Sequence, residues 1–240
     1  MDGTLYVVAT PIGNLSDITI RAKEVLSSVD FILAEDTRVV RNITKYLDIQ
    51  NNTLIYHQHS GNTTKEKILN LLNSGQTLAL VTDAGTPGVS DPGNELIDYL
   101  LSNNPNIKIV PIPGPSALTT ALSVCGFNVS QFIFVGFLPK RKRQKLFEWL
   151  SQAQKPFVFF DSPFRIRKTL EELKDIFPDR RVFIAREITK LHESLYRGTF
   201  DEVLSQLPSK IKGEITVIVE GVPGKNRTSI SGLGNPRSIR

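Results

Sequence analysis

The sequence predicts an α/β fold made of two α/β lobes with mainly parallel or mixed sheets. Short, almost continuously apolar segments alternate with amphipathic helical segments, which is typical of sheets covered on both faces. The alternation stops at the Pro/Gly-rich residues 111–115 and then restarts. With 240 residues, 40% of them hydrophobic, the chain is long enough for one large or two small domains. We therefore expect an N-terminal domain at residues 1–112 and a C-terminal domain at residues 113–223.

The first half alternates regularly between the two kinds of element. Its apolar side chains recur at helical spacing in the first predicted helix, from Ile18 to Val29. Thr63 and Glu66 predict a capping box for the third helix. Asp91 and Pro92 predict the N-cap and the first residue of the fourth helix. The expected strands are residues 5–8, 31–35, 54–57, 78–81 and 107–110, and the expected helices are residues 17–29, 39–47, 65–72 and 94–101.

The second half repeats the alternation. Ser162 and Pro163 predict the start of its clearest helix, whose apolar stripe indicates core packing. Cys125, the single cysteine, lies on an apolar helix face, so we expect a small core residue and no disulfide. The expected strands are residues 132–135, 157–160, 182–185, 195–199 and 215–219, and the expected helices are residues 117–125, 145–153, 165–177 and 201–207.

Composition excludes several classes of protein. No apolar run approaches the roughly 18 residues of a membrane span, and the first residues lack the pattern of a signal peptide, so we expect a cytoplasmic protein without a membrane partner. His57 and His59 have no nearby carboxylate or thiol, so we predict no metal. The net charge of +5 is concentrated, notably at residues 140–143 and in a basic tail at residues 224–240 that we expect to be flexible. This indicates a polyanionic partner, although a solvated helix face would also explain residues 140–143.

Three loops rich in proline and glycine follow apolar strands, at residues 9–14, 82–93 and 111–117. Such backbones are stiff and can approach a ligand closely, and ligands of open α/β sheets bind at the carboxyl ends of the strands. Ordinary well-capped connections would be the alternative. None of the loops matches the dinucleotide or P-loop patterns, so the ligand is not expected to be held through a pyrophosphate.

These loops and four further segments together resemble the tetrapyrrole methylase superfamily. Within it, the chain is most similar to the branch that methylates the ribose 2'-hydroxyl of a cytidine in small-subunit (16S) ribosomal RNA. The resemblance runs in order from residue 5 to residue 221. The further segments are Glu35-Asp36-Thr37-Arg38, Gly136-Phe137-Leu138-Pro139, Arg186-Glu187 with Thr189-Lys190, and Lys212-Gly213-Glu214.

The resemblance implies a usually dimeric, two-lobed enzyme that binds S-adenosylmethionine in the cleft between its lobes. Its partner would be small-subunit ribosomal RNA or the assembled 30S subunit. The chain has Asp161 and Phe164 where the family commonly has glutamate and histidine, which rules out a role for a histidine there. The motifs place the cofactor against Pro11, Gly13, Asp83, Gly85, Thr86, Ser116, Ala117, Leu138, Glu214 and Ile215.

A ribose hydroxyl must lose its proton to become a good nucleophile, so a positioned carboxylate or lysine is expected. Glu35, Asp36 and Arg38 at a strand end are our catalytic candidates, although Asp36 or Thr37 could instead cap the next helix. Glu187 with Lys190 is the second pair, with a surface ion pair as its alternative. The candidate RNA contacts are Arg38, Lys140, Arg141, Arg165 and Lys190, and the candidate stacking rings are Phe137 and Phe164.

Two other functions remain open at the level of sequence. The same cofactor pocket could serve a methylase of an acidic, tetrapyrrole-like small molecule, with arginines binding carboxylates. Alternatively, the basic patches alone could make a noncatalytic RNA-binding module.

Overall fold

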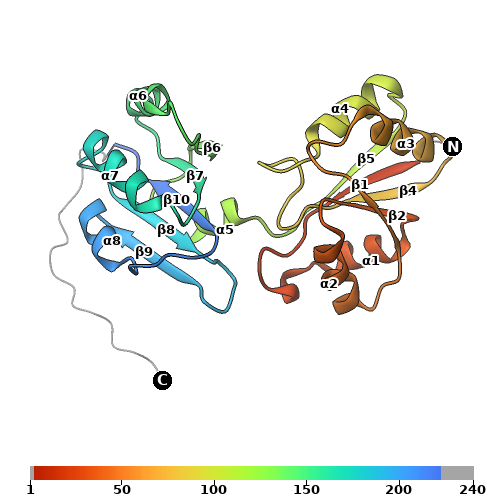
Figure 1. Ribbon diagram of the computed structural model, residues 1–240, viewed down its shortest axis with the longest axis horizontal. Coiled ribbons are helices and arrows are strands. Elements are labelled where there is room, and N and C mark those ends of the chain that lie inside the picture. The colour runs from red at the N-terminus through yellow and green to blue at the C-terminus, as the bar shows by residue number, and fades with distance from the viewer. Residues whose placement is uncertain (1–2, 223–240) are drawn as a thin grey trace.

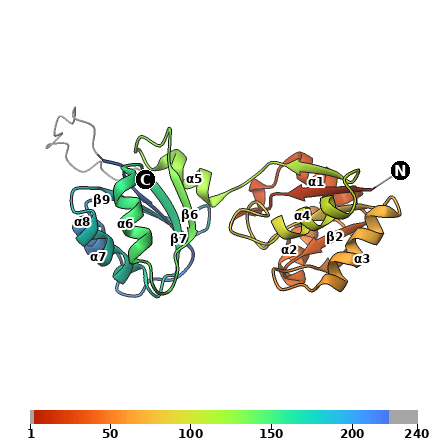
Figure 2. The same ribbon diagram turned by 90° about the horizontal axis from the view of Figure 1, so that it is seen from above.

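The computed structural model describes residues 3–222, which form two α/β halves lying side by side (Figures 1 and 2). The fold class expected from the sequence is confirmed. The division at residues 112 and 113 into separate domains stays a prediction, and the basic tail at residues 224–240 lies outside the described residues. No helix within residues 3–222 combines the length and apolarity needed to cross a bilayer.

The N-terminal half contains a five-stranded parallel sheet in the order β3-β2-β4-β1-β5. Helices α1 and α2 cover one face and α3 and α4 cover the other (Figure 1). The strands are β1 (Thr4–Val8), β2 (Phe31–Ala34), β3 (Asn52–Ile55), β4 (Thr77–Leu80) and β5 (Lys108–Ile112). The helices are α1 (Ile20–Ser28), α2 (Thr37–Leu47), α3 (Asn62–Asn73) and α4 (Asn94–Asn103), with a short 3-10 turn at Leu15–Asp17.

Burial on both faces explains the apolar strands of this half. In β2, Ile32 packs in the core beneath α1 and α2, whereas the next residue, Leu33, packs in the core beneath α3 and α4. Strands β4, β1 and β5 are neighbours in the parallel sheet, so the loops at their carboxyl ends emerge side by side. These are the three Pro/Gly-rich loops. The sheet order therefore brings together segments far apart in the sequence.

The C-terminal half contains a mixed five-stranded sheet in the order β6-β7-β10-β8-β9. Only β6 and β7 pair in parallel. Helices α6, α7 and α8 contribute to the core on one face, and α5 packs on the other, where Cys125 is fully buried as expected. The strands are β6 (Ile133–Phe137), β7 (Phe157–Asp161), β8 (Val182–Arg186), β9 (Ser194–Gly198) and β10 (Ile215–Val219), and the helices are α5 (Ala117–Val124), α6 (Gln144–Ala153), α7 (Ile166–Ile176) and α8 (Phe200–Gln206).

Three of the helix starts expected from capping motifs were wrong. Helix α3 begins after Gly61 without a side-chain cap, so the Thr63–Glu66 box does not form. Helix α4 begins after Gly93, whose φ of 148° turns the chain, and Asp91 lies outside the helix. Helix α7 begins after Arg165 rather than at Ser162 and Pro163. The first backbone N–H groups of a helix can be satisfied without a side-chain cap at the predicted position, and the Ser162 hydroxyl instead accepts from Phe164 N in the turn before α7.

Candidate functional site

A cavity of about 330 Å³ lies where the two halves meet. The N-terminal half contributes Ile12 and the loop after β4, and the start of α5 contributes Ser116 and Ala117. From the sheet of the C-terminal half come Phe160 and Asp161 at the end of β7 and residues 213–216 at the start of β10. The cavity is thus walled by strand ends from both sheets, as expected for a ligand site of an α/β protein.

The loop after β4 is fixed by hydrogen bonds to the other two Pro/Gly-rich loops. Thr10 and Gly85 exchange backbone hydrogen bonds of 2.9 and 3.1 Å, and the Thr10 hydroxyl donates to the Thr82 carbonyl at 3.1 Å. The Thr86 hydroxyl donates to the Pro115 carbonyl at 3.3 Å. Gly85 has φ of 84°, a conformation that a residue with a side chain rarely adopts. The site is therefore shaped before a ligand arrives.

The residues expected to bind a cofactor are distributed unevenly around this cavity. Pro11 and Gly13 flank the lining residue Ile12 without lining the cavity themselves, and Leu138 is buried behind it. The residues from our expectation that do line it are Asp83, Gly85, Thr86, Ser116, Ala117, Glu214 and Ile215. The sequence did not single out the apolar wall, which includes Ala84, Val89 and Phe160.

Arg165 fastens the end of β7 to the segment after β6. Its guanidinium forms an ion pair with Asp161, whose side chain is fully buried, and its Nη2 donates to the Leu138 carbonyl at 2.6 Å. The Asp161 Oδ2 atom and the Arg165 Nη1 atom are buried and have no hydrogen-bond partner within residues 3–222. Arg165, a candidate RNA contact, thus holds the lining residue Asp161 in place without lining the cavity itself.

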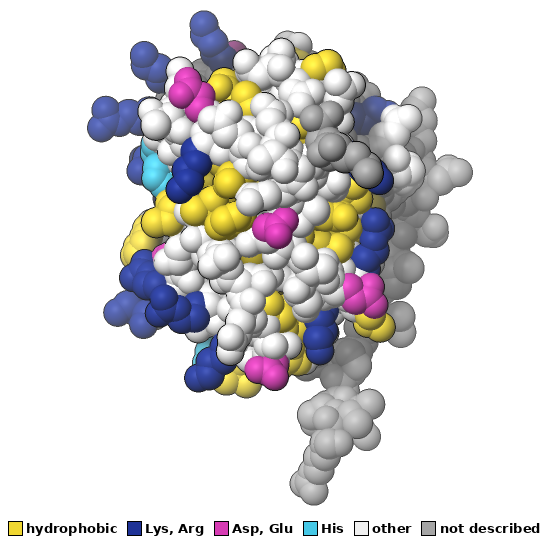
Figure 3. Space-filling view, turned by 90° about the vertical axis from the view of Figure 1, so that its right-hand side faces the viewer, with side chains coloured by type: hydrophobic (Ala, Val, Ile, Leu, Met, Phe, Trp, Pro, Cys, Tyr) yellow, Lys and Arg dark blue, Asp and Glu magenta, His cyan; other side chains and the backbone are white. Residues whose placement is uncertain are grey.

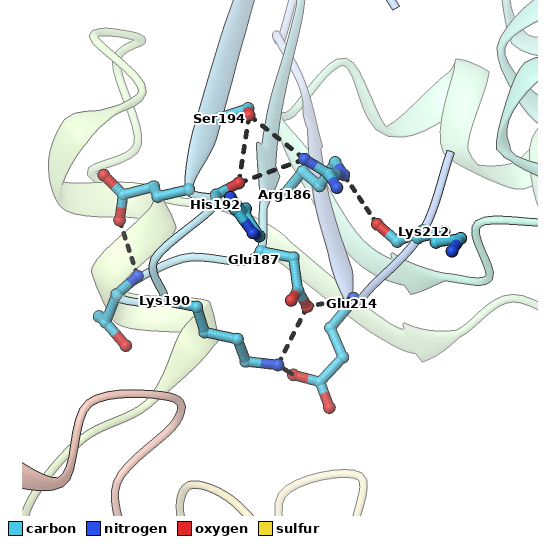
Figure 4. A network of polar contacts seen from close by, with 9 residues as sticks. Arg186, Glu187, Lys190, His192, Ser194, Lys212 and Glu214 are labelled. Carbon is cyan, nitrogen blue, oxygen red and sulfur yellow. Dashed lines mark hydrogen bonds and ion pairs between the residues drawn. The ribbon is translucent and has the colours of Figure 1, made fainter. Parts of the chain in front are cut away.

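Lys190 lies in a second polar network, on the turn between β8 and β9 (Figure 4). Its Nζ contacts Glu187 Oε1 at 3.0 Å and Glu214 Oε2 at 2.9 Å, and Glu214 N donates to the same Glu187 oxygen at 2.9 Å. Burial opposes the charge on Lys190, but the hydrogen bonds to Glu214 and Glu187 outweigh it and raise the pKa of the ammonium. A Cβ on Gly13 would lie 2.2 Å from Lys190 Cγ, so glycine permits this contact between the halves.

The Glu35–Arg38 segment ends β2 at the same edge of the sheet. Asp36 is the N-cap of α2, as our alternative interpretation stated, and accepts a hydrogen bond from Arg38 N at 2.8 Å. Hydrogen bonds from the side chain and backbone of Arg38 lower the pKa of Asp36 to about 2. The Arg38 side chain remains 86% exposed. Burial, followed by the nearby Asp83 charge, raises the pKa of Glu35, while His57 opposes this rise.

Asp91 lines the cavity but was interpreted only as a helix cap from the sequence. Burial, followed by the charges of Glu35, Asp83 and Glu214, raises its pKa to about 6. Burial also raises the pKa of Asp83. The sequence carried no signal for this crowding, because these carboxylates come from three separate segments: the end of β2, the loop after β4 and the start of β10.

Several of the predicted RNA-binding side chains are exposed. Lys140 and Arg141 are exposed just beyond β6, and Phe137 and Phe164 are 62% and 95% exposed. Figure 3 looks onto the end of the molecule away from the cleft and shows lysine and arginine side chains gathered along one margin, with acidic side chains scattered between apolar patches. The rings of His57 and His59 lie 6.4 Å apart, and no group of three or more potential metal ligands occurs in the described part of the chain.

The residues present fit S-adenosylmethionine, which combines an apolar adenine with hydroxyl and ammonium donors and a positive sulfur. The Oδ2 atom of buried Asp161 has no hydrogen-bond donor within residues 3–222, and burying a charged oxygen without a donor costs free energy. A hydroxyl or ammonium group of the cofactor would supply that donor. Asp83, Asp91 and Glu214 add negative charge around the cavity, and its apolar wall suits an adenine ring. A small apolar cavity with a few convergent polar groups is typical of cofactor sites.

Comparisons with known proteins identify the family of this chain. The family model of tetrapyrrole (corrin/porphyrin) methylases matches residues 4–204. The ribosomal RNA small subunit methyltransferase I of Thermotoga maritima is 45% identical over 221 residues, which cover 91% of this chain and 99% of that protein. The protein of the same name from Bacillus subtilis is 40% identical over 222 residues, covering 91% of this chain and 75% of that protein.

Solved structures show the same fold at low sequence identity. The methyltransferase CobJ superposes with a TM-score of 0.66 at 16% identity, covering 92% of this chain and 95% of its own. Diphthine synthase superposes with a TM-score of 0.67 at 13% identity, covering 91% and 90%. The family model spans most of the chain, and full-length relatives share more than a third of its residues. The resemblance found in the sequence is thereby confirmed, and the chain belongs to the tetrapyrrole (corrin/porphyrin) methylase family.

Proposed function

We propose that this protein transfers a methyl group from S-adenosylmethionine to the 2'-hydroxyl of a cytidine ribose in small-subunit ribosomal RNA. The observation that carries the proposal is the 45% identity to a ribosomal RNA small subunit methyltransferase I across almost the whole of both chains. The cavity between the halves, with its preformed loops and its unpartnered Asp161 oxygen, supports the cofactor part of the proposal.

The protein's part in this reaction is to bind and to orient. The backbone of Gly85, Ser116 and Ala117 and the carboxylates of Asp83 and Glu214, all of which line the cavity, would hold the cofactor, and Pro11 and Gly13 flank the lining residue Ile12. When bound, S-adenosylmethionine supplies an electrophilic methyl group on a positively charged sulfur. The surrounding carboxylates favour binding of that charge, and no side chain needs to attack a substrate. Catalysis then depends on alignment of the reacting atoms and on removal of one proton.

The exposed cations are suited to the RNA backbone. Lys140, Arg141 and Arg38 present charges to solvent beside the cleft, where phosphate contacts can position a strand without selecting its sequence. Lys190 and Arg165 contribute mainly through the internal networks that shape the cleft. We further propose that the substrate is the assembled 30S subunit or its RNA, that the protein acts as a homodimer, and that it works in the cytoplasm.

Methyl transfer to isolated small subunits tests this function directly. Recombinant protein is incubated with labelled S-adenosylmethionine and with 30S subunits, or naked 16S RNA, from cells lacking the protein. We expect label at a cytidine, resistant to alkaline cleavage because the 2'-hydroxyl is blocked. Label in neither substrate would refute the proposal. A steep loss of substrate affinity with salt is expected for RNA, whereas a small acidic macrocycle would show only a weak dependence.

A further inference from the structure

Asp91 lies on the partition between two cavities. One is the 330 Å³ cavity described above, and the other, of about 420 Å³, is lined by Tyr56 and Gln58 after β3, by the start of α4 and by the end of β6. Asp91 and Phe137 line both. A group on this partition can touch a ligand in either cavity. If one cavity holds the methyl donor, the acceptor must enter from the other.

The loop that carries Asp91 is held rigidly. Gly88 N donates to the Pro92 carbonyl at 3.2 Å, and Asn94 Nδ2 donates to the Gly88 carbonyl at 2.8 Å. Ser90 adopts a left-handed φ of 63°, which is uncommon for a residue with a side chain. Its hydroxyl would lie 2.9 Å from a Cβ on Gly136, so this loop meets β6 of the other half closely. The position of Asp91 is therefore set before substrate binds.

The Asp91 carboxylate is not engaged by any hydrogen bond or ion pair within residues 3–222. The other candidates for removing a proton are less suitable. Asp36 is held by Arg38 through contacts of 2.6 to 3.1 Å, and Lys190 is held by two glutamates. Glu35 lines neither cavity. Asp161 also has an unpartnered oxygen, but its other oxygen is held by Arg165 and Ser162 N, and Asp161 lines the 330 Å³ cavity alone. Asp91 has both oxygens unbonded within residues 3–222 and lines both cavities.

The second cavity suits a nucleoside turned out of its strand. The Phe137 ring, 62% exposed and 5.3 Å from the Phe160 ring, offers a face on which a base can stack. Hydrogen-bond donors and acceptors are added by the side chains of Tyr56, Gln58 and Glu95. A shallow aromatic and polar recess of this kind is typical of protein sites that receive a single unstacked base.

We infer that the 420 Å³ cavity receives the target nucleoside and that Asp91 is the general base that accepts the proton of its 2'-hydroxyl. The inference rests on the proposed function. In the transfer, a bond forms between the hydroxyl oxygen and the methyl carbon, and the methyl–sulfur bond breaks with its electron pair left on sulfur. The hydroxyl proton passes to an oxygen of Asp91, which later releases it to water.

The charges around Asp91 favour such a proton acceptor. Burial and the neighbouring carboxylates raise its pKa to about 6, and a base with a pKa near the working pH is the most effective. The cations close to these carboxylates are engaged elsewhere: Lys190 is shared between Glu187 and Glu214, and Arg38 is bonded to Asp36. The titratable groups that surround Asp91, either along the two cavities or through their charge, are Glu35 after β2, Tyr56 after β3, Asp83 after β4, Glu95 on α4, Asp161 on β7 and Glu214 before β10.

The test compares Asp91→Asn and Asp91→Glu with the unmodified protein in single-turnover methyl transfer to 30S subunits as a function of pH. The unmodified rate should rise with pH through about 6 and then level off. Asp91→Asn should lower the plateau by roughly 100-fold to 10,000-fold and remove the pH dependence. Asp91→Glu should keep a reduced rate with a pH dependence. Asp98→Asn, an exposed change of the same kind on α4, serves as the matched control and should leave the rate unchanged.

Calorimetric titration with S-adenosylmethionine provides a readout besides activity. Cofactor affinity should fall far less than the rate in Asp91→Asn, because Asp83 and Glu214 still supply negative charge around the cavity. The assignment is overturned if Asp91→Asn retains the rate or its pH dependence, or if cofactor affinity falls in parallel with the rate. Absence of methyl transfer by the unmodified protein would instead refute the proposed function. The two failures are thus distinguishable.

Discussion

The role of Arg165 provides the sharpest test of the reasoning from structure. The sequence suggested an RNA contact, whereas the structure shows its guanidinium bonded to Asp161 and to the Leu138 carbonyl. Replacing Arg165 by Met keeps most of the side-chain volume and removes both contacts. The prediction is a loss of folding stability rather than a loss of RNA affinity.

The size of this loss follows from what the substitution leaves behind. The Asp161 carboxylate would stay fully buried, with one remaining hydrogen bond from Ser162 N at 2.9 Å. Removing one partner of a buried ion pair costs about 3 to 5 kcal/mol. The Arg165 side chain is 22% exposed, so water screens the pair in part and about 3 kcal/mol is expected. For a chain of this length, that lowers the melting temperature by roughly 6 to 12 °C.

Urea denaturation and salt-dependent RNA binding measure the two effects separately. Arg165→Met should lose stability while keeping the salt dependence of RNA affinity. Adding Asp161→Asn removes the stranded charge, so the double variant should lie within about 1 to 2 kcal/mol of the unmodified protein. Arg141→Met, on an exposed arginine, should show the reverse pattern: unchanged stability and a salt slope reduced by about 1. An Arg165→Met protein of unchanged stability with a reduced salt slope would refute the reasoning.

Two further predictions concern the cleft. Gly13→Ala places a Cβ 2.2 Å from Lys190 Cγ and displaces the Lys190 side chain, so calorimetry should show cofactor affinity reduced by about tenfold, whereas Gly61→Ala, with nothing within 4 Å, should leave it unchanged. Asp91→Asn should stabilise the protein near pH 8. The pKa of Asp91 is about 6 in the folded protein and 3.8 ordinarily, so the free energy of unfolding falls as pH rises from 3.8 to 6. Above pH 6 the folded protein bears the full cost of the ionised, buried carboxylate, which the asparagine removes. After a discount for partial exposure of Asp91, the expected gain in the free energy of unfolding is about 1 to 1.5 kcal/mol. Urea titrations should show that this gain vanishes below about pH 4. A gain that persists at that pH would show that it does not come from ionisation of Asp91.

Much of the fold could be predicted from the sequence because the information is local. Apolar periodicity located each strand and helix of the described chain, and Pro111 proved compatible with a strand because β5 lies at the edge of its sheet. The Pro/Gly-rich loops were recognisable for the same reason. Their backbone restrictions are properties of the residues themselves, and parallel strands necessarily bring their carboxyl ends to one edge.

Helix starts could not be decided locally. A cap-type side chain is one of several ways to satisfy the first backbone N–H groups of a helix. Helix α3 follows the extended Gly61 and α4 follows the turn at Gly93, and neither has the expected side-chain cap. Asp91 was therefore assigned to a helix from the sequence. In the structure, Asp91 lies outside the helix and lines the cleft.

The sequence by itself determined the two α/β halves, the family and the loops that wall the cleft. Only the tertiary structure decided which charged side chains are free to act. Arg165 meets the Leu138 carbonyl 27 residues away, and Lys190 meets Glu214 across 24. Such pairings depend on distances between elements that no local pattern encodes, because a side chain can bond to whichever partner the packed sheets bring within about 3 Å. The physical reason is that hydrogen bonds and ion pairs act over a few ångströms in space, whereas sequence patterns register only neighbours along the chain.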